Sequence, residues 1–239
     1  MNKSRGCLLL IVLVLVSCAG KNLSLPKLTP APDRPPDCAP LFPQGNYQFV
    51  HLIEFSMPGG NHGTAMGVTV IGDNTIESVL MTVEGFVLFA ARLTDTLTVS
   101  RAVPPFDKPG FAPGMMRDIQ TIFLQPKGKI LPGSLRDTTS VCRITDNSDQ
   151  ITDIISTTEH CRRLNIYSTA GQLLRKISGH DCSVDLDGTL IPKTLELTSW
   201  EMGGYTLQLT LISAEKISTM EHANCYGVKG PCRKRPNEV

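Results

Sequence analysis

The chain has 239 residues, 41% of them hydrophobic, and its mean hydropathy is close to zero. These values indicate one globular domain with a hydrophobic core, or at most two small domains. The formal net charge is +1, and 21 basic against 22 acidic residues remain when an N-terminal segment with Lys3 and Arg5 is set aside. Such a balance excludes an electrostatic basis for nucleic-acid binding.

The first 17 residues have the layout of a secretory signal peptide. Lys3 and Arg5 precede an unbroken apolar run over 8–16, which is too short to cross a bilayer. Leu15-Val16-Ser17-Cys18 resembles a bacterial lipobox, whose cysteine receives acyl chains such as palmitate and becomes the first mature residue. The sequence therefore predicts a signal peptide over 1–17 and a lipid anchor at Cys18. An ordinary signal peptide with an unmodified cysteine is the alternative.

A proline-rich stretch follows the lipid site and extends to residue 45. Its prolines predict an extended, solvated tether that holds a folded domain off the membrane, because proline fixes φ and lacks an amide donor. They are Pro26, Pro30, Pro32, Pro35, Pro36, Pro40 and Pro43. We expect the domain over 46–218 and a C-terminal tail over 219–239, with a basic cluster that is either solvated or attracted to anionic headgroups.

Strand patterns fill most of the predicted domain. Short links between the strands imply antiparallel neighbours, since a parallel crossover needs a dozen residues or more. The expected strands are 47–55, 66–70, 75–83, 86–93 and 97–101, then 141–145, 150–156, 164–168, 173–177, 183–186, 194–200 and 205–212. Between the two sets, residues 115–125 have helical spacing and end at Pro126, and Pro132-Gly133 predicts a turn.

About ten to twelve short strands with one helix predict a mainly β fold whose sheet curls, because open twisted sheets rarely exceed about ten strands. We expect an antiparallel half-barrel or open barrel with the central helix as a lid across its mouth. A greasy strand and an adaptable, Met-rich helix face predict the lining of a lipid-sized cavity, with ordinary core packing as the alternative. The candidate residues are Phe86, Leu88, Met116, Ile119 and Phe123.

Six of the eight cysteines lie outside the signal peptide and the lipid site, and an even number in an exported chain predicts disulfides. They are Cys38, Cys142, Cys161, Cys182, Cys225 and Cys232, of which only the last two are close enough in sequence to suggest a local pair. Histidine near cysteine at His160, His180 and His222 could hold a metal or activate a nucleophile. The lack of Cys-x-x-Cys spacing favours disulfides, so we expect no metal, cofactor or catalytic residue.

Three stretches, 83–89, 117–126 and 204–211, carry a family resemblance. With the lipobox and the tether, they resemble a family of uncharacterised bacterial lipoproteins that is similar to the carrier and receptor proteins of the lipoprotein localisation (Lol) pathway. This resemblance implies an unclosed β-barrel that binds acyl chains on its concave face under a helical lid. Ala19 after the lipid site implies the periplasmic face of the outer membrane, by resemblance to the sorting rule of Gram-negative lipoproteins.

The sequence therefore predicts a non-enzymatic, membrane-anchored periplasmic lipoprotein that binds a lipid or lipoprotein acyl chain, in envelope lipid or lipoprotein transport. The alternative is a structural or assembly lipoprotein that binds an envelope protein through a sheet edge or a surface patch. The expected partners are the membrane, through the lipid anchor, and an acyl chain or an envelope protein. No nucleic acid is expected.

Overall fold

The computed structural model describes residues 24–30, 41–135, 139–147, 149–156, 161–185, 188–201 and 203–217. Several sequence predictions lie outside the described residues: the signal peptide, Cys18, Cys38, His160, His222, Cys225, Cys232 and the tail. Within the described part of the chain, no helix combines the length and the apolar character needed to cross a bilayer.

A single antiparallel sheet of 13 strands forms the described fold, in the order β1-β7-β8-β9-β10-β11-β12-β13-β2-β3-β4-β5-β6. The strands before the helix are β1 (Thr29–Pro30), β2 (Tyr47–Ser56), β3 (His62–Ile71), β4 (Ile76–Met81), β5 (Val87–Leu93) and β6 (Leu97–Ala102). Those after it are β7 (Lys129–Leu135), β8 (Thr139–Thr145), β9 (Ile151–Ile155), β10 (Arg162–Tyr167), β11 (Leu173–Val184), β12 (Leu190–Ser199) and β13 (Tyr205–Lys216).

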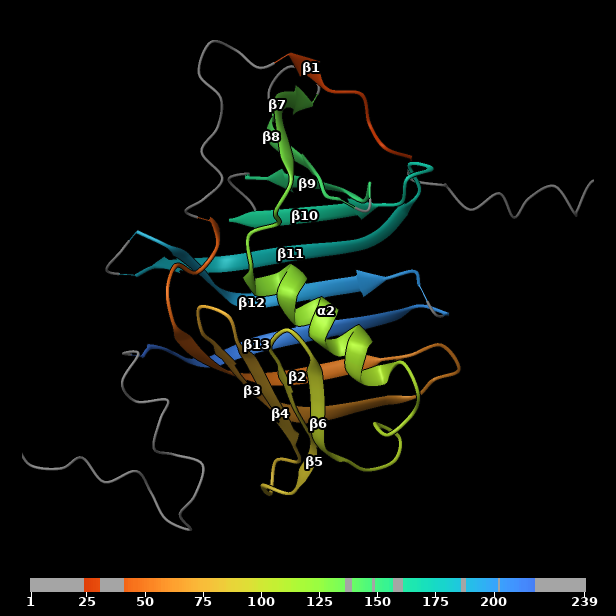
Figure 1. The fold of residues 1–239 in the computed structure, drawn as a ribbon, viewed down its shortest axis with the longest axis vertical. Helices are drawn as coiled ribbons and strands as arrows, with labels where there is room; N and C mark the ends of the chain where they lie inside the picture. Colours follow the sequence, from red (N-terminus) through yellow and green to blue (C-terminus); the bar gives the residue numbers. More distant parts are fainter. Residues whose placement is uncertain are drawn as a thin grey trace, which may run out of the picture.

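The sheet curls around the helix α2 (Phe111–Phe123), which lies on its concave face (Figure 1). In this view β10–β13 run across the page, whereas β4–β6 run steeply, because the strand direction turns along the sheet. The predicted mainly β fold, an antiparallel curled sheet with a covering helix, is confirmed.

The helix begins and ends earlier than the predicted range 115–125. It follows Gly110, whose φ of 87° is a backbone conformation that glycine adopts without strain. Pro113 lies in its first turn, where a missing amide donor costs no hydrogen bond. Leu124 is already extended, so the helix ends before Pro126.

Two predictions about strands are wrong. Residues 129–135 form β7 rather than a turn, and Pro132 is tolerated because β7 pairs with only two residues on its outer side. The predicted strands 173–177 and 183–186 are one strand, β11, of 12 residues. Asp181, with φ of 52°, lies within β11, and the register with β12 is the same before and after it.

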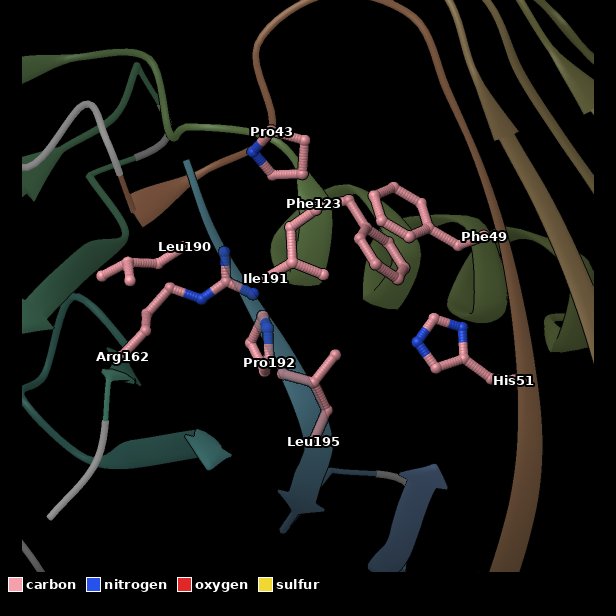
Figure 2. A pocket seen from close by; sticks show the side chains of 9 residues that line it. All are labelled: Pro43, Phe49, His51, Phe123, Arg162, Leu190, Ile191, Pro192 and Leu195. Carbon is pink, nitrogen blue, oxygen red and sulfur yellow. The ribbon is translucent and has the colours of Figure 1, made fainter. Parts of the chain in front are cut away.

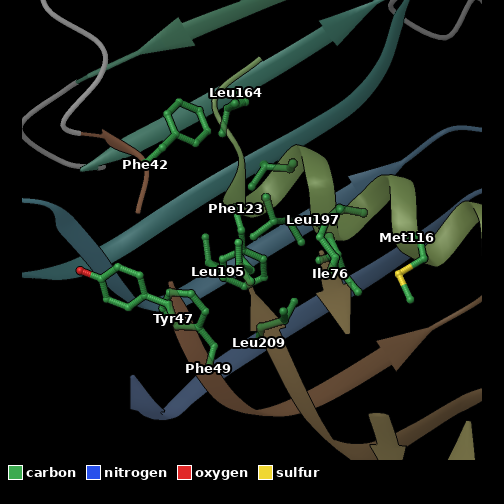
Figure 3. Packing of buried hydrophobic residues seen from close by; sticks show 14 of the residues in the cluster. Phe42, Tyr47, Phe49, Ile76, Met116, Phe123, Leu164, Leu195, Leu197 and Leu209 are labelled. Atoms are coloured by element: carbon green, nitrogen blue, oxygen red, sulfur yellow. The ribbon is translucent and has the colours of Figure 1, made fainter. Parts of the chain in front are cut away.

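The core lies between α2 and the concave face of the sheet (Figure 3). Alternate residues of the central strands point into it, as expected for strands with one buried face. Buried side chains from the sheet include Phe49, Leu164, Ile177, Leu195, Leu197 and Leu209, and those from the helix are Met116, Ile119, Ile122 and Phe123. The rings of Phe123 and Phe49 stack with centroids 4.8 Å apart, which joins the last turn of α2 to β2.

A buried polar cluster fixes the middle of α2 to the sheet. Tyr205 on β13 donates a hydrogen bond of 2.5 Å to Asp118, and Arg175 on β11 lies 3.5 Å from the same carboxylate. Arg175 also pairs with Glu201 at 2.6 Å. Burial raises the pKa of Asp118 despite the opposing effects of Tyr205 and Arg175. The cluster therefore supplies partners for groups that would be costly to bury alone.

Part of the proline-rich segment packs on the opposite face of the sheet. The Leu25 amide donates to the Gly171 carbonyl at 2.8 Å, and Arg143 donates to the Pro26 carbonyl at 2.8 Å. Thr29 and Pro30 then pair with β7. The expected solvated backbone is wrong for 24–30, because prolines lack a donor but still offer carbonyls to the sheet. The tether boundaries 18–45 stay a prediction.

The predicted disulfides are confirmed for three described cysteines. Cys161 and Cys182 are bonded, with Cα atoms 6.0 Å apart, and Cys142 is also disulfide-bonded. The Cys161–Cys182 bond joins the start of β10 to the far half of β11, so neither thiol is available as a metal ligand beside His180.

His51 is the one imidazole in the described core. Its side chain points from β2 toward α2, and its ring lies 5.8 Å from that of Phe123. Burial lowers the pKa of His51 to about 4. The ring is therefore neutral at pH 7.

Replacing Asp118 by alanine removes the carboxylate from the polar cluster and leaves Tyr205 without its acceptor. We expect the free energy of unfolding to fall by about 3 kcal/mol, as for a broken buried ion pair. Urea denaturation measures this loss. Gln120→Ala, on the exposed face of the same helix, should stay within about 0.5 kcal/mol of the native chain. Equal effects of the two substitutions would contradict the role of the cluster.

Stability should also depend on pH through His51. Its folded-state pKa is lowered from 6.5 to about 4, so the unfolded chain binds the extra proton in that window. The free energy of unfolding should then fall by up to about 3 kcal/mol between pH 6.5 and 4, measured by denaturation at each pH. His51→Phe should flatten this dependence, whereas replacing the exposed His62 by glutamine should leave it in place. An unchanged profile in His51→Phe would contradict this account.

Candidate functional site: a cavity beneath the helix

A small cavity lies between the end of α2 and the concave face of the sheet (Figure 2). Its lining is mostly apolar, with two nitrogen-bearing side chains. The lining residues are Pro43, Phe49, His51, Phe123, Arg162, Leu190, Ile191, Pro192 and Leu195. About 10 Å³ is open to the centre of a water molecule, so the cavity holds about one water as it stands.

The sheet register explains why these side chains meet. Phe49 and His51 are alternate residues of β2 and therefore point to the same face. Arg162, Gly179 and Leu195 are successive partners across β10, β11 and β12, so Arg162 and Leu195 share the concave face. Phe123 closes the cavity from the helix side.

The segment that leads into β2 closes one end of the cavity. Leu41 and Phe42 are buried in the core, and Pro43 forms part of the lining. Arg162 binds this segment, because its Nη1 donates to the Leu41 carbonyl at 2.6 Å and its Cζ lies 4.8 Å from the centre of the Phe42 ring. This cation–π geometry and the hydrogen bond hold the segment against β10.

Arg162 is 1% exposed, and no described carboxylate forms an ion pair with it. Burial alone lowers its pKa to about 10. The side chain therefore remains protonated at pH 7 and places a positive charge at the wall of an apolar cavity.

On the β2 side of the cavity lies the neutral ring of His51. Its described contacts are with aromatic rings, at 6.1 Å from Phe49 and 5.8 Å from Phe123. The cavity can therefore offer one imidazole N–H donor and several guanidinium N–H donors to a ligand, while its remaining walls are apolar.

The structure brings together three of the five residues predicted for a cavity lining. Met116, Ile119 and Phe123 are buried on the sheet-facing side of α2, and Phe123 alone of these lines the cavity. Phe86 is 72% exposed, because 82–86 form a turn and β5 begins only at Val87. Leu88 is half-buried and is adjacent in sequence to the inward-facing Phe89, so it lies on the opposite face of β5.

Sequence reasoning missed His51 and Arg162. His51 carried a usable signal, since it alternates with Phe49 and Ile53 on an apolar strand face. Arg162 carried none, because arginine is usually a surface residue and only the tertiary fold buries it.

The sequence matches no protein-family model and no curated protein. Among solved structures, the chain is similar to a LolA superfamily protein from Nitrosomonas europaea, with 16% identity and a TM-score of 0.51 over 74% of this chain and 88% of that one. It also matches a structure described as an outer membrane lipoprotein-sorting protein domain from Vibrio parahaemolyticus, at 10% identity and a TM-score of 0.45, over 75% of this chain and 89% of that one.

A DUF1329 family protein from Desulfovibrio piger matches at 10% identity and a TM-score of 0.46, over 72% of this chain and 85% of that one. Of these similarities, the one to the Nitrosomonas europaea protein is close enough to define the architecture. Because the sequence identity is low, this similarity shows the fold and nothing further. The curled antiparallel sheet with a helix on its concave face is a Lol-type fold.

Proposed function

We propose that the protein is a non-enzymatic lipoprotein, anchored through Cys18 at the periplasmic face of the outer membrane, that binds an acyl chain of a lipid or lipoprotein between α2 and the sheet. The observation that carries this proposal is the apolar cavity between Phe123 and Leu195, at the interface of the helix and the concave sheet face. The Lol-type fold supports it, because the family resemblance implies acyl-chain binding at that interface.

The helix α2 is attached to the sheet through side chains, which allows it to act as a movable cover. Among the described residues, no backbone hydrogen bond joins the helix to a strand. The helix contacts the strands through apolar side chains and through the Asp118 cluster. Irregular connections flank it, over 103–110 and 124–128. A displacement of α2 exposes its apolar face and the facing strands, and the buried apolar area of an acyl chain then replaces the lost packing.

Opening is required, because the closed cavity has room for about one water. On the side of α2, the cavity is covered by Phe123 from the helix and by Pro43 from the segment that leads into β2. The bound state therefore has a displaced helix end, a displaced segment over 41–43, or both.

The second candidate function is assembly with an envelope protein. It is favoured by β6, which lies at one edge of the described sheet and is mostly exposed, with Val99 43% exposed. An edge strand with free backbone groups can pair with a strand of another protein.

Photo-crosslinking in cells tests the two candidates on the full chain. A photoreactive residue replaces Leu190 in the cavity wall, and matched variants carry it at the exposed Lys193 of the same strand or at Val99. We expect an adduct with the mass of an acyl lipid at position 190 and none at 193, identified by mass spectrometry. The absence of a lipid adduct at 190, together with one dominant protein adduct at 99, would reject acyl-chain binding in favour of assembly.

A further inference from the structure

We propose that the cavity beneath α2 binds the anionic head of an acyl ligand, with its carboxylate or phosphate oxygens on the guanidinium of Arg162 and its chain along the apolar wall. This inference rests on the proposed acyl-chain function and adds the chemical class of the ligand, an anionic amphiphile.

The hydrogen bonds of Arg162 leave most of its donors unused. A guanidinium carries five N–H donors, and among the described residues this one donates to a single carbonyl, that of Leu41, through Nη1. Nε is buried without a hydrogen-bond acceptor. An unpaired, desolvated cation is costly, so a site that keeps one gains from an anion that completes its contacts.

Two other arginines with little solvent exposure form ion pairs with carboxylates, in contrast to Arg162. Arg175 is as buried as Arg162, at 1% exposed, and pairs with both Asp118 and Glu201. Arg143, on the other face of the sheet, forms a two-pronged pair with Asp153 at 2.6 and 2.8 Å. Among the described residues, Arg162 has no such carboxylate, and it is the arginine that lines the apolar cavity.

The rest of the lining fits the two parts of an amphiphile. Arg162 and His51 lie on opposite sides of the cavity and both extend toward it (Figure 2). The guanidinium and the imidazole N–H are therefore two donors that the lining offers to the oxygens of an anionic head.

The other seven lining residues are apolar. A small free anion would leave these walls unused, whereas an acyl chain attached to the anion buries against them. The acyl head is therefore the source that the lining favours.

Photoreactive analogues of hexadecanoate and hexadecanol test this inference on the full chain in detergent. They share one chain and differ in the charge of the head, which is ionised for the acid at about pH 8. The readout is labelling of the cavity wall within 188–201. We expect the acid to label this peptide about tenfold more than the alcohol, as for a charge-assisted contact.

Variants assign the preference to one side chain. Arg162→Gln should abolish the preference for the acid and keep labelling by the alcohol, and Arg162→Lys should retain part of it. Arg163→Gln is the matched control, since the adjacent residue of β10 lies on the opposite face. If Arg162→Gln does not fold, the ratio of labelling by the acid to labelling by the alcohol in the native chain decides whether the site prefers an anionic head. Acetate in large excess should leave labelling by the acid unchanged.

The failures are distinguishable. Equal labelling by acid and alcohol in the native chain would overturn the anionic site and leave acyl-chain binding in place. Labelling by neither would overturn both proposals. Displacement of the acid by acetate would assign the site to a small free anion, and an equal loss of preference in Arg163→Gln would remove Arg162 from the site; either result overturns the inference.

Discussion

The fold depends on one apolar contact, the packing of α2 into the concave face of the sheet. Curling brings residues from β11 to β5 within reach of a helix of 13 residues, which contacts Arg175 at one side and Phe89 at the other. The 13-stranded sheet alone would leave this face in water. Covering this face with side-chain contacts stabilises the closed form. Because no backbone hydrogen bond joins the described helix to the strands, a ligand chain can replace these contacts without breaking the sheet.

The polar groups buried between α2 and the sheet are of two kinds, those paired with an opposite charge and those without such a partner. Asp118 accepts a hydrogen bond from Tyr205 and forms an ion pair with Arg175, and these two contacts fix the position of the helix on the sheet. Arg162 and His51 lie at the other end of the interface, without a carboxylate among the described residues to neutralise the guanidinium. The first kind explains why α2 occupies one position. The second kind gives the interface a chemical preference that an all-apolar core would lack.

Much of this architecture could be predicted from the sequence, because strand alternation and short links such as Gly203-Gly204 are local signals. The helix was identified from the spacing of Met116, Ile119 and Phe123, although the actual end residues differ. Longer-range effects could not be predicted. Pro132 predicts a turn as long as the pairing of β7 is unknown. The packing of 24–30 depends on Arg143, which is distant in sequence. Phe86 lies in a turn rather than in β5 and is exposed. The burial of Arg162 follows only from the meeting of β10 with the segment at Leu41.

The central claim is that an acyl ligand enters between α2 and the sheet by moving the helix. Pulsed electron paramagnetic resonance measures this directly, with spin labels at the exposed Gln120 on α2 and the exposed Lys193 on β12 of the full chain. The account predicts that the distance between the two labels lengthens, or its distribution broadens toward longer values, when the protein is saturated with an acyl lipid. A distance distribution that is the same with and without the lipid, under conditions where the lipid is bound, would contradict it.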